Sequence, residues 1–153
     1  MSAVLESKPA FRPMRREDLA RVMEIERDLY PFPWSEGNFR DSLQAGYSCW
    51  VCERARAVVG YAVLMLAAGE AHVLNIAIAR AWQRQGLGTA LLRHLIALAR
   101  DYGAREMFLE VRPSNETARR LYHGMGFNEI GLRPRYYPAH GGREDAILMA
   151  LTL

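Results

Sequence analysis

The chain has 153 residues, which is enough for one domain with a hydrophobic core and too few for two. Hydrophobic residues make up 50% of it and charged residues 24%, as in globular proteins, and no run approaches the roughly 20 apolar residues of a membrane span. The net charge of +3 is too small and scattered for a nucleic-acid-binding protein, and residues 1–13 lack the apolar core of a signal peptide. We therefore expect a single cytoplasmic domain over residues 1–153, with residues 1–10 as a flexible lead and neither a membrane nor a direct nucleic-acid partner.

The first part of the chain predicts strands and helices from its hydrophobic periodicity. The expected elements are a strand over residues 11–14, a helix over 17–30, a helix from 35 to about 43, and strands over 47–53 and 58–66. Pro31 and Pro33 end the first helix, and Ser35 is a suitable N-cap for the second.

Two aromatic residues, Phe32 and Trp34, lie in the short connection between these helices. They either line a substrate groove together with Tyr136 and the segment around it, residues 133–138, or fill the space beneath a loop. Glu36 and Asp41 follow them, and either is a candidate for attracting a positively charged substrate end. Either carboxylate suits the positive end of a helix equally well, so both interpretations stay open.

Cys49 and Cys52 form a C-x-x-C pattern inside an expected strand. An offset of three along a strand sends the two side chains to opposite faces, whereas a redox pair lies at a helix start. A zinc site would need two further ligands at suitable spacing, which the four histidines do not provide. We therefore expect two buried thiols and no metal.

The middle of the chain predicts a strand over residues 73–78, a tight turn over 83–89 and a long helix that ends before Gly103. A helix start has unpaired N–H groups and a partial positive charge, so it readily holds phosphate. Gly86 and Gly88 would let the backbone approach a phosphate closely, and Arg84 adds a formal charge. The turn is neither a P-loop nor the dinucleotide fingerprint, because it lacks Gly-Lys-Ser/Thr and a third glycine. A turn that only packs helix against strand is the alternative.

The last part of the chain predicts a strand over residues 105–111 and a helix over about 115–124. Strands over 127–132 and 145–151 follow, joined by a long link over residues 133–143. Together the elements predict one mixed α/β domain, with a single central sheet of about seven strands and helices on both faces.

Two motifs carry a family resemblance. Gln83, Gly86 and Gly88 fit the pattern Q/R-x-x-G-x-G/A, and residues 115–127 fit N-x-x-A-x-x-L-Y-x-x-x-G-F. At this separation, the two patterns resemble the cofactor site of the GNAT N-acetyltransferase superfamily. Five further blocks resemble the RimI-type ribosomal-protein alanine N-acetyltransferases: P-F-P-W-S at 31–35, L-N-I-A at 74–77, L-E-V-R at 109–112, Y-Y-P at 136–138 and G-R-E-D-A at 142–146.

The resemblance implies the GNAT acyl-CoA N-acyltransferase fold and acetyl-CoA as cosubstrate. It implies acetylation of the N-terminal alanine of a small-subunit ribosomal protein, by direct attack of the amine on the thioester. Glu110 would be the proton acceptor and Tyr122 the proton donor, and a backbone N–H of residues 76–78 would hold the oxyanion. The residues expected to contact acetyl-CoA are Ile76, Ala77, Ile78, Arg84, Gln85, Gly86, Leu87, Gly88, Thr89 and Asn115.

Structural alternatives stand beside these roles. Glu110 also suits a solvated strand end, Tyr122 also suits a core position on its helix face, and Asn115 suits an N-cap, which is compatible with a cofactor contact. Neutralising an α-amine at pH 7 costs only about 1 kcal/mol, against roughly 4–5 for lysine, so an N-terminus is the easier acceptor. The competing functions are acetylation of another amine, such as a protein lysine or a small molecule, and a CoA-binding regulatory module without catalysis.

Overall fold

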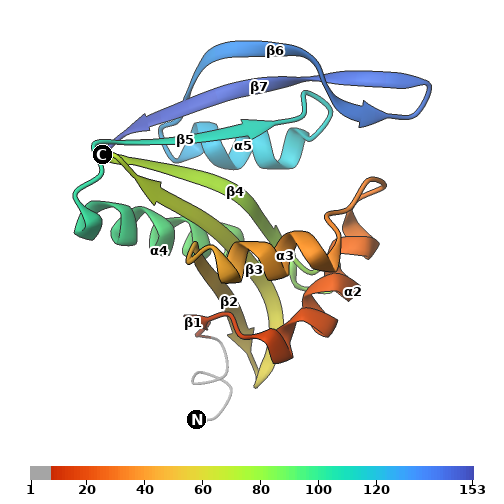
Figure 1. The fold of residues 1–153 in the computed structure, drawn as a ribbon, viewed down its shortest axis with the longest axis vertical. Coiled ribbons are helices and arrows are strands. Elements are labelled where there is room, and N and C mark those ends of the chain that lie inside the picture. The colour runs from red at the N-terminus through yellow and green to blue at the C-terminus, as the bar shows by residue number, and fades with distance from the viewer. Residues whose placement is uncertain (1–7) are drawn as a thin grey trace.

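Two groups of strands meet along one short parallel pairing in the computed structural model, which describes residues 8–153 (Figure 1). Within these residues the strands form a seven-stranded sheet in the order β1-β2-β3-β4-β5-β7-β6. Their bounds are β1 (Ala10–Pro13), β2 (Ser48–Arg54), β3 (Ala57–Ala67), β4 (Glu70–Ile78), β5 (Glu106–Val111), β6 (Asn128–Ala139) and β7 (Gly142–Thr152). All pairings are antiparallel except that of β4 with β5. Most of the predicted N-terminal lead falls on residues 1–7, outside the described residues.

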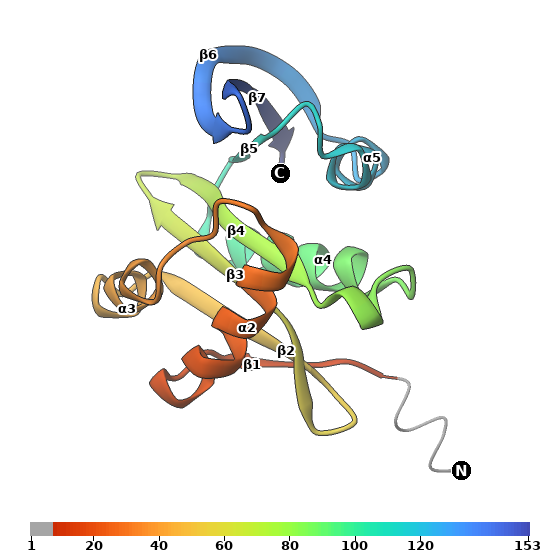
Figure 2. The same ribbon diagram turned by 90° about the vertical axis from the view of Figure 1, so that its right-hand side faces the viewer.

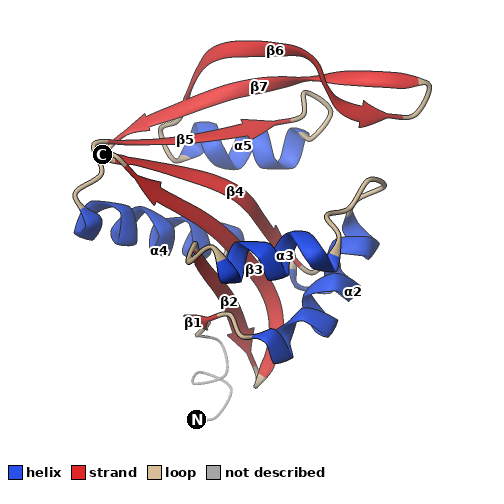
Figure 3. Cartoon of the chain, viewed as in Figure 1, coloured by secondary structure: helices blue, strands red, loops and turns tan. Residues whose placement is uncertain are grey.

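The helices lie on both faces of this sheet, which confirms the predicted mixed α/β fold. They are α2 (Leu19–Leu29), α3 (Glu36–Gln44), α4 (Leu87–Tyr102) and α5 (Glu116–Gly124), with short 3-10 turns η1 (Arg16–Asp18) and η2 (Arg80–Trp82) (Figure 3). Helices α2 and α3 cover one face, and α4 and α5 cover the other (Figure 2). No helix in residues 8–153 has the length and apolar character needed to cross a bilayer.

Each face of the sheet has its own hydrophobic core, and the two cysteines show this division. Cys49 packs with residues of α2 and α3, whereas Cys52 packs with residues of α4 on the other face. Both thiols are buried and free in the described structure, and burial raises the pKa of each to about 11. The expected pair of buried thiols on opposite faces is therefore confirmed, because successive strand residues alternate between faces.

The sheet opens between β4 and β5. Their pairing begins at Glu70↔Glu106 and ends at Val73↔Leu109, after which the two strands diverge (Figure 1). At the same point the register with β3 shifts, and Leu74 is the extra residue on β4. A bulge of this kind bends its strand and changes the direction of the following residues. The remainder of β4 therefore has β3 on one edge and an opening on the other.

The predicted link over residues 133–143 is wrong, because most of these residues extend a long β6–β7 hairpin. Ala139 pairs with Gly142, so only two residues form the turn. Pro134 and Pro138 lie within this stretch, but β6 is an edge strand, where a residue without an N–H is tolerated. The register between β6 and β7 shifts between Arg133 and Tyr137, and this bulge bends the hairpin.

Candidate active site

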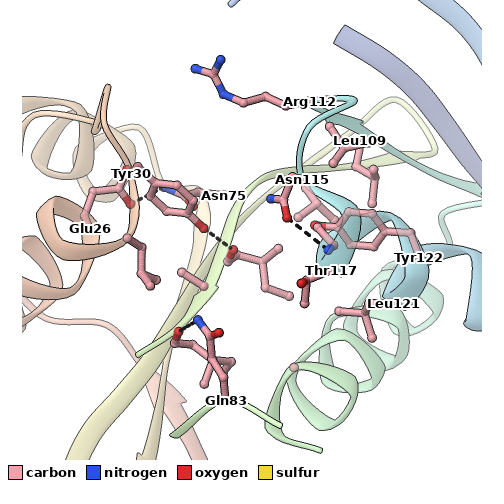
Figure 4. A pocket seen from close by; sticks show the side chains of 18 of the residues that line it. Glu26, Tyr30, Asn75, Gln83, Leu109, Arg112, Asn115, Thr117, Leu121 and Tyr122 are labelled. Carbon is pink, nitrogen blue, oxygen red and sulfur yellow. Dashed lines mark hydrogen bonds between the residues drawn. The ribbon is translucent and has the colours of Figure 1, made fainter. Parts of the chain in front are cut away.

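An open cleft of about 1100 Å³ occupies the gap between the diverging strands β4 and β5. One side is formed by α2 and by residues 30–34, which we call the aromatic loop, and the other by β5, α5 and the β6–β7 hairpin. Figure 4 shows Glu26 and Tyr30 on the first side and Asn115 and Tyr122 on the second, with β4 between them. The cleft thus brings together most of the segments that carried the family resemblance.

The edge of β4 that faces the cleft carries backbone groups that do not pair with β5. Tyr30 Oη donates to Ile76 O (3.4 Å) and Gln83 Nε2 donates to Ile78 O (2.9 Å), so both carbonyls lie on this edge (Figure 4). In a strand the N–H and C=O of one residue point the same way, so the N–H groups of Ile76 and Ile78 also face the cleft. Ala77 has the opposite orientation and faces β3. Of the three amides considered for an oxyanion, the geometry retains Ile76 and Ile78 and does not favour Ala77.

The N-terminus of α4 opens into the same cleft. Gly86 is its N-cap, with φ 79°, and no side chain among the described residues caps the first turn. The bond from Ala90 N to Gly86 O (3.0 Å) closes the first turn, so the preceding amides lack intrahelical partners. Arg84 is also left-handed, with φ 63°, and such residues shape backbone amides into concave anion sites. This turn therefore fits the pyrophosphate of acetyl-CoA.

The predicted phosphate-binding residues do not all reach this cleft. Arg84, Gly86, Leu87, Gly88 and Thr89 line it. Gln85 is not among the lining residues of the described structure, because its side chain turns away and its Oε1 accepts from Arg54 Nη1 (3.2 Å). Any contact of Gln85 with a phosphate would therefore involve its backbone N–H.

Gly86→Val is expected to raise the Kd for acetyl-CoA by about tenfold, because a β-branched residue strongly disfavours a positive φ. A built Cβ meets nothing within 4 Å, so the effect comes from displacement of the turn amides and not from a clash. Isothermal titration calorimetry measures it. Gly103→Val is the matched control, since Gly103 ends the same helix with φ 90°. An equal change in Kd for both variants would contradict a specific role of the turn.

Gly88→Val is expected to weaken binding similarly, for a steric reason. A Cβ on Gly88 would lie 3.5 Å from Leu121 Cδ2 and 4.0 Å from Ile78 Cγ1, within the gap between α5 and β4. The two methyl groups of valine would then fill space that the cleft leaves open. An acetyl-CoA Kd equal to that of the parent would show that acetyl-CoA does not occupy this part of the gap.

Glu110 lies on β5 and lines the opposite side of the cleft. Its side chain is 28% exposed, and its Oε1 lies 3.7 Å from Arg133 Nη2. Its Oε2 is buried and finds no hydrogen-bond partner within residues 8–153. An unpaired buried carboxylate oxygen is costly unless a further group supplies the missing donor. This arrangement suits a proton acceptor better than a solvated strand end.

Tyr122 lies on α5 and is both a core residue and a cleft residue. It is 6% exposed, its ring centroid lies 5.8 Å from that of Phe127, and it lines the cleft. Burial raises the pKa of Tyr122 above its ordinary value, with smaller contributions from Tyr30 and Tyr137. The phenol therefore keeps its proton at neutral pH, as a donor must. The same shift makes it a weaker acid than free tyrosine, so donation depends on stabilisation of the receiving atom.

Asn115 combines two roles at the start of α5. Its Oδ1 accepts from Ala118 N (3.2 Å), which confirms the predicted N-cap. The residue also lines the cleft, beside Ser114 and Thr117. The helix start is therefore fixed by its own side chain while its polar groups border the opening.

The predicted substrate-binding residues divide into two groups. Phe32, Trp34 and Tyr136 line the cleft. Glu36 is not among the described lining residues, and its carboxylate forms an ion pair with Arg40, one turn along α3. The structure therefore favours the helix-start interpretation of Glu36 over a substrate contact.

Arg112 is a residue whose role the sequence did not reveal. Its guanidinium carbon lies 4.5 Å from the ring centroid of Tyr137 and 5.9 Å from that of Phe32. Its Nη1 donates to Pro138 O (2.7 Å) and lies 3.2 Å from Glu144 Oε1. Arg112 thus fastens the hairpin to the end of β5 and touches the aromatic loop. Its partners occur in the P-F-P-W-S, Y-Y-P and G-R-E-D-A blocks, so the co-occurrence of these blocks was the available signal.

Comparison with known proteins agrees with this geometry. A family model described as Acetyltransferase (GNAT) family matches residues 19–127. The [ribosomal protein bS18]-alanine N-acetyltransferase of Escherichia coli (strain K12) is 41% identical over 136 residues, covering 89% of this chain and 92% of that protein. The enzyme of the same name from Haemophilus influenzae is 38% identical over 137 residues, covering 89% and 93%.

A solved structure gives the same result. The crystal structure of the ribosomal-protein-S18-alanine N-acetyltransferase from Escherichia coli matches with a TM-score of 0.88 and 39% identity, covering 95% of this chain and 94% of that one. The family model spans well over half of the chain, and the curated relatives exceed the identity at which a shared family is secure. The chain belongs to the GNAT acetyltransferase family.

Proposed function

We propose that this protein transfers the acetyl group of acetyl-CoA to the N-terminal alanine of a ribosomal protein. The observation that carries the proposal is one cleft that holds the unpaired Glu110 oxygen, the Tyr122 phenol and the free edge of β4. Alanine as the acceptor residue is supported by relatives at 38–41% identity whose names specify ribosomal protein bS18.

The residues present fit acetyl-CoA. The first turn of α4, which no side chain within residues 8–153 caps, and Arg84 would hold its pyrophosphate, and the edge of β4 would pair with its amide-bearing arm. Asn115 borders the same opening from α5. When bound, acetyl-CoA supplies an acetyl group that is activated as a thioester.

Glu110 accepts the proton that the amine loses when it becomes nucleophilic. An α-amino group has a pKa near 7.7–8.0, so at pH 7 the neutral form costs about 1 kcal/mol. One well-placed carboxylate is a sufficient base for that step, and such help is typically worth about 10²–10⁴ in rate. Lysine, with a pKa near 10.4, would need roughly 4–5 kcal/mol. A single carboxylate such as Glu110, whose Oε2 has no partner within residues 8–153, therefore favours the more easily neutralised N-terminal acceptor.

The other two groups stabilise charge on the acetyl side. The N–H groups of Ile76 and Ile78 face the cleft and would donate to the acetyl oxygen as negative charge develops there, which is worth roughly 3–4 kcal/mol for a preorganised donor. Tyr122 donates its phenolic proton to the departing sulfur. In this mechanism the amine attacks directly, and no protein side chain acts as a covalent nucleophile.

A peptide pair tests the acceptor. One peptide has a free N-terminal alanine and no lysine, and the second has the same sequence with a blocked N-terminus and one internal lysine. Mass spectrometry should find one acetyl group on the first peptide and none on the second. Acetylation of the second peptide alone would assign the enzyme to lysine, and acetylation of neither would point to a small-molecule amine or a regulatory module. Intact ribosomal proteins, assayed in the same way, would then identify the physiological acceptor.

Trp34→Ala and Tyr136→Ala are each expected to raise the peptide KM about fivefold and to leave the Kd for acetyl-CoA unchanged. Both aromatic side chains line the cleft from opposite sides and give it rigid walls, so a peptide loses little ordering entropy on entry. Steady-state kinetics and calorimetry separate the two constants. Tyr102→Ala removes a half-exposed aromatic residue at the far end of α4 and serves as the control. A normal peptide KM in both variants would show that Trp34 and Tyr136 do not contribute to acceptor binding.

A further inference from the structure

Glu26, on α2, carries a buried carboxylate that the proposed reaction does not use. The residue borders the cleft but is only 2% exposed. In the described part of the chain its Oε1 accepts from Tyr61 Oη (2.7 Å) and Asn75 Nδ2 (3.1 Å), and its Oε2 accepts from Trp34 N (2.9 Å). These three donors are neutral, and they come from β3, β4 and the aromatic loop.

A carboxylate buried at this position costs more free energy than an apolar side chain would. Burial removes it from water, neutral donors return only part of the lost solvation, and an apolar side chain of similar size would avoid that cost. A carboxylate does offer several acceptor sites on two oxygens, which no neutral side chain matches. Glu26 uses them to join three elements at one point, which indicates a geometric requirement.

We propose that Glu26 is a positioning residue that fixes the aromatic loop to β4 and so sets the width of the acceptor side of the cleft. Its Oε2 holds the loop through the Trp34 N–H, and its Oε1 holds β4 through Asn75. Asn75 lies between Leu74, the extra residue of the bulge, and Ile76, whose amide faces the cleft. The carboxylate therefore links the expected peptide wall to the strand edge where the acetyl group would lie. The inference rests on the proposed acceptor function.

Glu26 is not a second base. Both of its oxygens already accept hydrogen bonds, and its burial keeps an incoming amine away from them. Glu110 differs, because its Oε2 has no partner within residues 8–153. Glu110 and Glu26 therefore have different roles in the cleft. Glu110 accepts a proton, and Glu26 holds the aromatic loop in position.

Glu26→Gln tests the proposal, because glutamine keeps the shape but replaces one acceptor with an NH₂ group that faces donors. The peptide KM is expected to rise about tenfold, while the Kd for acetyl-CoA changes by less than about twofold. Hydrogen exchange at the Trp34 amide, followed by NMR, should accelerate about tenfold. Glu24→Gln is the matched control, since Glu24 lies on the exposed side of the same helix and pairs only with Arg21 among the described residues.

If Glu26→Gln does not fold, Asn75→Ala tests the proposal instead, because it removes the Asn75 Nδ2 donor and leaves the Glu26 carboxylate in place. It is expected to raise the peptide KM about threefold without faster exchange at the Trp34 amide, whose own bond remains. Where Glu26→Gln does fold, the double variant with Asn75→Ala should raise the peptide KM by less than the product of the two single effects, because both act through one network.

Two results would overturn the inference. One is a parallel rise in the peptide KM and the acetyl-CoA Kd, which would indicate a general loss of structure. The other is faster exchange at Trp34 with an unchanged peptide KM, which would show that the anchored wall does not shape acceptor binding. If the parent protein acetylates no N-terminal alanine, the proposed function fails separately, while protection of the Trp34 amide by Glu26 can still be measured.

Discussion

Glu110→Gln is expected to lower kcat by about 10²–10⁴ at pH near 7 and by much less at about pH 9. Glutamine preserves the shape of the side chain but cannot accept a proton. Below the amine pKa of about 7.7–8.0 most acceptor molecules are protonated and need the base, whereas above it the neutral amine is abundant. The loss should therefore shrink as the pH rises. A pH–rate profile of the variant and the parent measures it.

Glu106→Gln is the matched control for this profile. Glu106 lies on the same strand but is exposed and does not line the cleft described for residues 8–153. Its variant should follow the parent at every pH. A Glu110→Gln variant that also followed the parent would remove Glu110 from the mechanism and leave its unpaired Oε2 without a function.

Tyr122→Phe is expected to lower kcat about 100-fold while the Kd for acetyl-CoA stays within about twofold, because only the proton donor is lost and the buried ring remains. Burial raises the pKa of Tyr122, so the phenol of the folded protein stays protonated beyond the ordinary range of tyrosine. The parent enzyme should therefore show no fall in kcat as the pH rises to about 10, where a free phenol is already about half ionised. Steady-state measurements at several pH values give kcat, and rapid mixing with acetyl-CoA gives its Kd.

Tyr102→Phe provides the comparison, since it removes a phenol that is half-exposed at the C-terminal end of α4. Its kinetics should equal those of the parent. An unchanged kcat in Tyr122→Phe would assign proton donation to another group. A fall in parent activity near pH 9 that Tyr122→Phe abolishes would show that the phenol ionises in its ordinary range.

Features that depend on a few neighbouring residues were predictable from the sequence. Gly86 and Gly88 marked the start of α4, Asn115 marked that of α5, and the spacing of Cys49 and Cys52 placed the thiols on opposite faces. In each case the relevant contacts lie within one turn of a helix or along one strand, where local geometry decides the outcome.

Features that depend on distant partners were not predictable. The three donors to Glu26 are 8, 35 and 49 residues away, so nothing beside it in sequence indicated a buried carboxylate network. The orientation of Ala77 depends on its register with β3, and a shift of one residue would have reversed it. The strand β6 contains Pro134 and Pro138, which a central strand would not tolerate, and the position of β6 at the sheet edge was not evident from the sequence.

The position of β7 has a consequence for the newborn protein. Synthesis proceeds from the N-terminus, so β1 to β4 and the helices around them leave the ribosome well before β7. β7 is the last strand in sequence, yet it lies between β5 and β6 and supplies Leu148, the partner of Glu110. A nascent chain that stalls before residue 142 would contain the turn at residues 84–89 but lack β7, so β5 and β6 would present unpaired edges. Such edges attract chaperones and invite aggregation. The wall that carries Glu110 is therefore complete only after β7 has paired with β5.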